Sequence, residues 1–121
     1  MLILLAHGSR DRQWRDSLAS LVQAVGVKMP QEEVRVAFMQ FEGPTLREVV
    51  EDAARSGENP VRILPLFMAS AGHVDKDIKP LVGELVGKYP GTALELLAPV
   101  GESDLFPTLI AHIATGPSEP S

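Results

Sequence analysis

The sequence predicts a single three-layer α/β domain in which helices cover both faces of a four-stranded parallel sheet. Two observations carry this prediction. Four short apolar runs recur along the 121 residues, and a longer stretch with helical spacing of apolar residues follows each of them. The first three runs are almost continuous in Val, Ile, Leu and Phe, as is typical of strands buried on both faces of a parallel sheet.

The apolar runs are the expected strands, over residues 2–6, 34–38, 61–66 and 93–97. Right-handed crossovers between strands this short allow few sheet orders, and 2-1-3-4 is the simplest one with helices on both faces. In this order the first and third strands are neighbours, about 4.8 Å apart. The loops that leave their carboxyl ends therefore lie side by side, at the edge where open α/β sheets bind ligands.

The helical stretches are expected over residues 11–28, 44–57, 74–88 and 102–114. The apolar side chains of the first helix fall on one side: Trp14, Leu18, Leu21, Val22 and Val25. Pro44 suits the first turn of the second helix, and Pro80 kinks the third helix or divides it in two. Residues 1–115 form the domain, and residues 116–121 are expected to be a flexible C-terminal tail.

Composition excludes several kinds of site and partner. Because the chain has no cysteine, a metal would need His, Asp, Glu, Gln, backbone or the substrate itself as ligand. A net charge of -5 argues against a nucleic-acid partner, since such binding rests largely on Lys and Arg at phosphates. The first apolar run is too short for a membrane span and has no basic leader, so we expect a cytoplasmic protein without a membrane partner. A chain of this length is too small for two lobes, so a cleft would need a second chain.

Two histidines follow strands that are expected to be neighbours. His7 comes directly after the first strand and His73 follows the third, and each lies beside a glycine, Gly8 or Gly72, where the backbone can approach a ligand. Imidazole nitrogens bind borderline divalent ions such as Co²⁺, Ni²⁺, Fe²⁺ and Zn²⁺, and they exchange protons near neutral pH. The pattern therefore predicts a metal or proton-transfer site. His112, late in the fourth helix, has no such setting and is expected to be a surface or structural residue.

Further polar residues flank the same edge. Gln40 and Glu42 share one side of an extended segment after the second strand, so either can point towards the site. Glu42 is equally typical of a solvated loop acid near a helix N-terminus. The cationic side chains on this rim, together with helix N-termini, could receive the carboxylates of an acidic ligand; they are those of Arg10, Arg12, Lys76 and Lys79.

Other signals in the sequence are weaker. Asp75 and Asp77 are more typical of acids in the first turn of a helix than of ligands. The sequence contains no P-loop, no Gly-x-Gly-x-x-Gly and no Gly-x-Ser-x-Gly, which argues against the standard nucleotide sites and a serine nucleophile. The tripeptide that contains His7 has alanine where histidine phosphatases carry the arginine that holds phosphate.

Two runs within the domain carry a resemblance to a known family. Leu-Leu-Ala-His-Gly-Ser-Arg-Asp occupies residues 4–11, and Pro-Leu-Phe-Met-Ala-Ser-Ala-Gly-His-Val-Asp-Lys-Asp-Ile occupies residues 65–78. With the Ala-Phe-Met run of the strand between them, they resemble the small CbiX-type sirohydrochlorin chelatases over residues 2–114. The resemblance implies a chelatase-like fold and a homodimer of short chains. It also implies that His7 and His73 bind the incoming metal and assist proton removal.

The chain departs from this family at the end of the second strand. Family members commonly carry Phe-Leu-Glu there, whereas this chain has Phe38-Met39-Gln40 and a glutamate displaced to Glu42. Glutamine cannot act as a base. Either Glu42 acts as the base in place of the family glutamate, or a carboxylate base is not needed in this protein.

The leading hypothesis is insertion of a divalent metal, Co²⁺ first and Fe²⁺ or Ni²⁺ next, into sirohydrochlorin during cobalamin, siroheme or related tetrapyrrole synthesis. The metal is a substrate, and no organic cofactor is expected. The residues expected to act in catalysis are His7, His73 and Glu42, with the two histidines as metal ligands. The residues expected to bind the tetrapyrrole are Ser9, Arg10, Gln40, Phe67, Met68, Gly72 and Lys76.

Two other interpretations fit the same residues. A carrier of the same fold would bind a tetrapyrrole or a metal without turnover, which the glutamine at position 40 favours. A flavodoxin-like regulatory or phosphate-binding domain would use the turn at Ser9 and Arg10 and the N-terminus of the first helix. The carrier would leave sirohydrochlorin metal-free in the presence of ions, and the phosphate-binding domain would not depend on His73.

Overall fold

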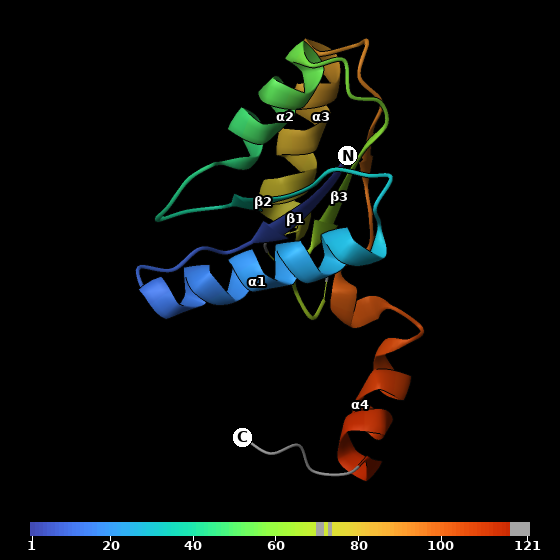
Figure 1. Cartoon of the computed structure of the whole chain (residues 1–121). Coiled ribbons are helices and arrows are strands. Elements are labelled where there is room, and N and C mark those ends of the chain that lie inside the picture. The colour runs from blue at the N-terminus through green and yellow to red at the C-terminus, as the bar shows by residue number, and fades with distance from the viewer. Residues whose placement is uncertain (70–71, 73, 117–121) are drawn as a thin grey trace.

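The computed structural model describes residues 1–69, 72 and 74–116, and strands alternate with helices along this part of the chain (Figure 1). The strands are β1 (Leu2–Ala6), β2 (Val34–Phe38), β3 (Val61–Pro65) and β4 (Leu94–Leu96). The α-helices are α1 (Arg12–Lys28), α2 (Leu46–Arg55), α3 (Lys79–Lys88) and α4 (Phe106–Thr115). A π-helical turn, η1 (Val74–Ile78), precedes α3, and a 3₁₀ turn, η2 (Val100–Glu102), follows β4.

The four strands form one parallel sheet in the order β2-β1-β3-β4, which confirms the predicted topology. At the centre of the sheet Leu4 lies between Val36 of β2 and Leu64 of β3. All five residues of β1 are buried, as a continuous apolar run in a central strand requires. The carboxyl ends of β1 and β3 are therefore neighbours.

The two faces of the sheet are covered differently. Helices α2 and α3 lie together on one face, and α1 lies on the other (Figure 1). Under α2 and α3, a large core joins buried side chains of the sheet, such as Ile3 and Ile63, to buried side chains of the helices, such as Val50 and Leu85. Under α1 the cluster is small, and Leu18 is the buried residue of that helix. The predicted apolar side of α1 is thus only partly covered, since Trp14 and Leu21 are exposed.

Local sequence signals explain where the helices begin. Asp11 caps α1 by accepting a hydrogen bond from the N–H of Gln13 at 2.9 Å. Thr45 and Glu48 form a reciprocal capping box at the start of α2. The third helical stretch is divided, as the proline at position 80 predicted: η1 ends at Ile78 and α3 begins directly after it.

The fourth helix is shorter than predicted, because it begins at Phe106 instead of residue 102. Ser103 has extended backbone angles, and its hydroxyl accepts a hydrogen bond from the N–H of Leu105 at 3.2 Å. Pro107 then falls in the first turn of the helix, where its missing N–H leaves no hydrogen bond unmade. A start at residue 102 would have placed this proline in the helix interior.

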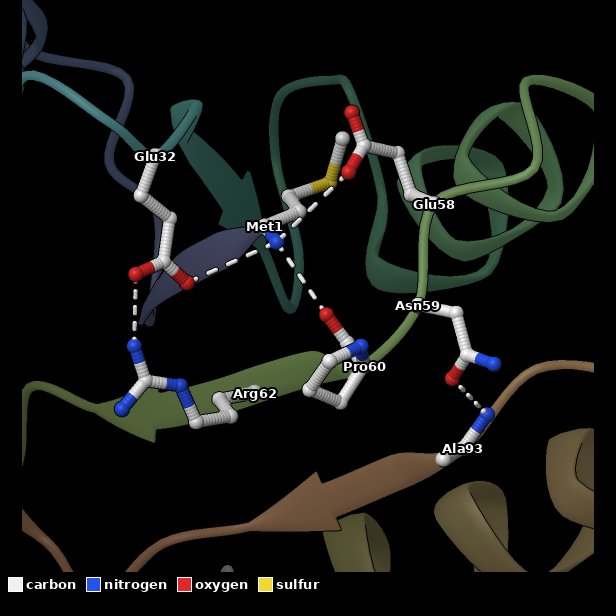
Figure 2. A network of polar contacts seen from close by, with 7 residues as sticks. All are labelled: Met1, Glu32, Glu58, Asn59, Pro60, Arg62 and Ala93. Carbon is white, nitrogen blue, oxygen red and sulfur yellow. Dashed lines mark hydrogen bonds and ion pairs between the residues drawn. The ribbon is translucent and has the colours of Figure 1, made fainter.

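The amino end of the sheet carries a network of charges (Figure 2). The amino group of Met1 donates a hydrogen bond to the carbonyl oxygen of Pro60 at 3.1 Å and lies 3.5 Å from Glu32 and 3.7 Å from Glu58. Arg62, on β3, donates a hydrogen bond of 2.6 Å to the other carboxylate oxygen of Glu32. The network thus joins the first strand to the loops that precede β2 and β3.

The same network shifts the titration of two of its members. The hydrogen bond and charge of Arg62, with the charge of the amino terminus, hold the pKa of Glu32 below its ordinary value. Glu32 in turn raises the pKa of Arg62.

None of the helices in the described part of the chain is long and apolar enough to cross a membrane.

Candidate functional site

The loop after β1 is held against the segment that continues β2. Beyond the paired strands, the N–H of Met39 donates to the carbonyl oxygen of Ala6 at 3.0 Å, and that of Gln40 donates to the carbonyl oxygen of His7 at 3.1 Å. Gly8 has a φ of +96°, and a Cβ at this position would lie 1.9 Å from the carbonyl oxygen of Gln40. Glycine is therefore required here, both for the backbone conformation and for the close approach of the two backbone segments.

His7 is positioned by Phe67, which follows β3. The two ring centroids are 4.3 Å apart with an interplanar angle of 31°, and Phe67 itself is buried. The prediction that the loops after the first and third strands lie side by side is confirmed by this contact. The loop after β4 supports Phe67, because the N–H of Gly101 donates to its carbonyl oxygen at 3.0 Å. A Cβ at Gly101 would lie 2.3 Å from the carbonyl oxygen of Met68, so the two loops are in close contact.

His7 lines a cavity of about 550 Å³ at this edge of the sheet. The cavity lies on the α2 and α3 side, and its apolar wall comes from strand ends and helix starts: Leu5, Phe38, Met39, Leu46, Ile78 and Leu81. Its polar lining, besides His7, consists of Gln40, Thr45, Arg47 and Asp77. A largely apolar hollow with a few convergent polar groups is typical of a site for a small organic ligand.

Three of these polar lining residues are not among the site residues predicted from sequence. Thr45 caps α2, Arg47 lies in the first turn of α2, and Asp77 lies in η1. The predicted strand order contained the signal for them, since it places the start of the second and third helices over the same edge as His7. Arg47 also forms an ion pair of 2.7 Å with Glu84 of α3, which ties together the two helices that flank the cavity.

Glu42 lies outside the cavity lining, on the side of α1. Its side chain is 7% exposed, and its Oε2 accepts a hydrogen bond of 2.7 Å from the N–H of Ser9. Its Oε1 lies 3.5 Å from Nε of Arg15, and the two form an ion pair without hydrogen-bond geometry. This oxygen is buried and has no hydrogen-bond partner within the described part of the chain. The carboxylate therefore joins the loop that carries His7 to the start of α1.

The remaining predicted residues lie on the rim. Arg10 stacks over the ring of Phe41 at 4.9 Å, and both side chains are exposed. Met68, Gly72 and Lys76 are also exposed, on the segment between β3 and α3. Exposed side chains at this edge are available to a ligand, but these four residues are not among the residues that line the cavity.

His73 lies outside the described residues, as do Ser70 and Ala71. Among the residues that the structure does describe, no three His, Asp or Glu side chains come together as a metal-binding group. The nitrogen donor at the cavity is His7, and the carboxylate in the same lining is Asp77. His112, in α4, is exposed and lies apart from the cavity lining.

Comparison with protein families and with curated proteins gives consistent results. A family model described as CbiX matches residues 1–115. A sirohydrochlorin cobaltochelatase from Methanopyrus kandleri is 35% identical over 85 residues, which cover 68% of this chain and 57% of the relative. A sirohydrochlorin cobaltochelatase from Saccharolobus islandicus is 28% identical over 106 residues, 79% of this chain and 77% of the relative. The chain thus spans less than two thirds of the length of the first of these relatives.

Solved structures show the same fold. A CbiX protein of cobalamin biosynthesis from Marinobacter aquaeolei VT8 superposes with a TM-score of 0.80 and 29% identity, over 94% of this chain and 90% of that one. The sirohydrochlorin chelatase SirB from Bacillus subtilis, solved in complex with cobalt, superposes with a TM-score of 0.76 and 21% identity. That match covers 93% of this chain and 48% of SirB.

Proposed function

Because this chain belongs to the CbiX family, we propose that it inserts a divalent metal ion, Co²⁺ first, into sirohydrochlorin. The observation that carries the proposal is the place of His7, an imidazole at the carboxyl edge of the sheet that lines a largely apolar cavity. Two relatives named sirohydrochlorin cobaltochelatase support the choice of substrate and of metal. Fe²⁺ and Ni²⁺ are the next candidates, since they also accept nitrogen ligands.

The reaction exchanges one metal ion for two protons. As the metal enters, it binds the four ring nitrogens while two N–H bonds break, so two protons must leave the ring. His7, with His73 from the neighbouring loop, is proposed to hold the ion above the ring and to accept these protons. The contact with Phe67 at 4.3 Å supports this role, because it restricts where the imidazole can lie.

The tetrapyrrole is proposed to lie against the apolar wall of the cavity. Sirohydrochlorin carries several carboxylates while the chain has a net charge of -5, so local cations are needed where the ligand binds. Arg47 lines the cavity and is the nearest candidate, with Arg10 and Lys76 on the exposed rim. Gln40 lines the cavity as well, where its amide can donate or accept a hydrogen bond but cannot take up a proton.

For Glu42, the contacts favour a supporting role over one as proton acceptor. Its carboxylate is engaged by the N–H of Ser9 at 2.7 Å and lies outside the cavity lining. It therefore holds the loop that follows His7. The imidazoles are then the proposed proton acceptors of the site. The glutamine at position 40 is consistent with this, because it cannot take up a proton where family members carry a glutamate.

An anaerobic absorption time course tests the proposal. Sirohydrochlorin is mixed with Co²⁺, Ni²⁺ or Fe²⁺, with and without the protein, and metallation is followed by the change in the spectrum. We expect the protein to accelerate metallation and His7→Ala to reduce the rate about 100-fold or more. The matched control is His112→Ala, which removes an exposed imidazole of α4 and should leave the rate unchanged.

The alternative is a carrier, which the replacement of the family glutamate by Gln40 favours. A carrier would bind sirohydrochlorin without accelerating metallation by any of the three ions. That result, or near-normal turnover by His7→Ala, would overturn the proposed chelatase.

A further inference from the structure

The positive charge in the cavity lining is already paired with a carboxylate of the protein. Among the described residues that line the cavity, Arg47 is the only lysine or arginine. Its Nη2 donates a hydrogen bond of 2.7 Å to Oε2 of Glu84. A ligand carboxylate that approaches the same nitrogen must therefore compete with Glu84.

Glu84 lies next to the cavity without lining it. Leu81, near the start of α3, is part of the lining, and Glu84 follows it by three residues on the same helix. Residues three apart are neighbours on one helix face. Glu84 is thus placed to hold the cation of the site while the cavity itself stays available to a ligand.

The pair is one that a ligand can open. The side chains of Arg47 and Glu84 are 47% and 58% exposed. An ion pair this exposed contributes little to stability, because water solvates both charges and salt screens them. Exchange of Glu84 for another carboxylate therefore costs little. A buried pair would be costly to open, because it would leave a charge without partner or solvent.

The tether of Glu84 to the same chain decides which anions can displace it. A group held beside its partner by the fold competes at an effective concentration on the order of millimolar. A small free anion at lower concentration does not displace it. A ligand whose body is held against the apolar wall presents its own carboxylate at a comparable effective concentration, and such a ligand does.

We propose that Glu84 is a specificity-determining residue, which excludes small anions from Arg47 and yields it to a carboxylate of a ligand whose apolar body lies in the cavity. The inference rests on the proposed function in one respect, since it takes sirohydrochlorin as that ligand. It requires binding and not metal insertion, so it applies to a chelatase and to a carrier alike.

Equilibrium binding of metal-free sirohydrochlorin tests the proposal without turnover. The dissociation constant is measured by ultrafiltration, under anaerobic conditions and without added metal. We expect Glu84→Gln, which keeps the size of the side chain and removes its charge, to tighten binding about 2- to 5-fold. A substitution that merely disturbed the fold would weaken binding, so a gain in affinity identifies competition.

Two controls separate competition at Arg47 from a general loss of negative charge. Glu51→Gln removes the same charge from a pair of equal length, 2.7 Å from Arg55, and neither of these two residues lines the cavity. It should leave the dissociation constant unchanged. Arg47→Ala should weaken binding about 10-fold, and adding Glu84→Gln to that variant should have no further effect.

Competition by citrate tests the exclusion of small anions. Citrate carries carboxylates but no apolar body that the cavity wall could hold. At millimolar concentration it should weaken the binding of sirohydrochlorin to Glu84→Gln and not to the unaltered protein, relative to sodium chloride of the same ionic strength. An equal effect of citrate on both proteins would overturn the exclusion of small anions by Glu84.

Three other results would overturn the inference while the proposed function stands. They are unchanged or weaker binding by Glu84→Gln, an equal gain in affinity by Glu51→Gln, and a gain that persists in the absence of Arg47. Failure of the proposed function has a different signature, in which sirohydrochlorin is bound but no ion is inserted faster. Absence of binding by the unaltered protein and by every variant would overturn both.

Discussion

The two ends of the same sheet are built by different means. At the amino end, charged groups neutralise one another: Met1, Glu32, Glu58 and Arg62 form ion pairs and hydrogen bonds around the start of β1 and β3 (Figure 2). At the carboxyl end, backbone hydrogen bonds align the loop after β1 with the segment after β2, and the conformation of the first of these loops depends on the positive φ of Gly8. The amino end therefore contributes to stability, whereas the carboxyl end positions His7 beside the cavity.

This difference sets what a substitution at each end should change. Ion pairs with partly exposed members contribute little each and weaken in salt. A close approach of two backbones leaves no room for an added atom, and the surrounding chain cannot relax without moving the site. Changes at the carboxyl end should therefore affect metallation most, and changes at the amino end should affect stability alone.

The largest effect is expected from Gly8→Ala. The new Cβ would lie 1.9 Å from the carbonyl oxygen of Gln40, at a φ of +96° that alanine rarely adopts. We expect the free energy of unfolding to fall by about 2 to 5 kcal/mol, with loss of metallation as His7 is displaced. Urea unfolding and the metallation assay measure the two effects.

The matched control for this substitution is Gly83→Ala, inside α3, where an added Cβ meets nothing within 4 Å. This variant should be slightly more stable than the unaltered protein and fully active, because alanine favours the helix. Equal stability of Gly8→Ala and the unaltered protein would show that the loops after β1 and β2 are not held together as described.

A smaller effect is expected from Glu42→Gln, which keeps the shape of the side chain and removes its charge. The hydrogen bond to Ser9 loses its charge assistance, so the free energy of unfolding should fall by about 1 kcal/mol. Metallation should fall less than about 10-fold, whereas loss of a proton acceptor would reduce the rate about 100-fold or more. Unfolding and metallation measured on the same preparation distinguish the two roles, and the larger loss of rate at unchanged stability would make Glu42 the base.

The fold was predictable from the sequence because burial and strand period act locally. The continuous apolar run at residues 2–6 can be satisfied only in the middle of a sheet with both faces covered, and it is the fully buried β1 of the structure. The proline at position 80 divides the third helical stretch because it lacks an N–H. The start of α4 was less predictable, since it depends on the extended Ser103, which no periodicity reveals.

The site was predictable in part. His7 could be identified because it is the first polar residue after a buried strand and is followed by a glycine. Asp77 was passed over, because an acid at that position is more typical of a helix start than of a ligand, although the predicted strand order places that helix start over the same edge of the sheet. The direction in which Glu42 points depends on Arg15 and Ser9, two contacts made across the fold that periodicity does not encode.

At the amino end, Glu32→Gln should lower stability by about 0.2 to 1 kcal/mol, because it weakens one ion pair with Arg62 and one with the amino group of Met1. Metallation should be unchanged, since this network lies at the other end of the sheet from His7. The matched control is Glu33→Gln, at an exposed neighbouring carboxylate, which should change neither property. A loss of metallation in Glu32→Gln at full stability would contradict the division between the two ends.

The smallest effect is the pH dependence of the same pair. The pKa of Glu32 lies below its ordinary value of 4.5 in the folded protein, chiefly because Arg62 donates a hydrogen bond to its charged form. The folded chain therefore binds this proton less readily than the unfolded chain, and the stabilisation is fully present above pH 4.5. It is lost as the pH falls from that value through the lower pKa of the folded state. The stability difference between the unaltered protein and Glu32→Gln, measured by urea unfolding across this acidic range, should shrink towards zero as the pH is lowered. A difference that persists at the acidic end would show that the contribution of Glu32 comes from packing and not from its charge.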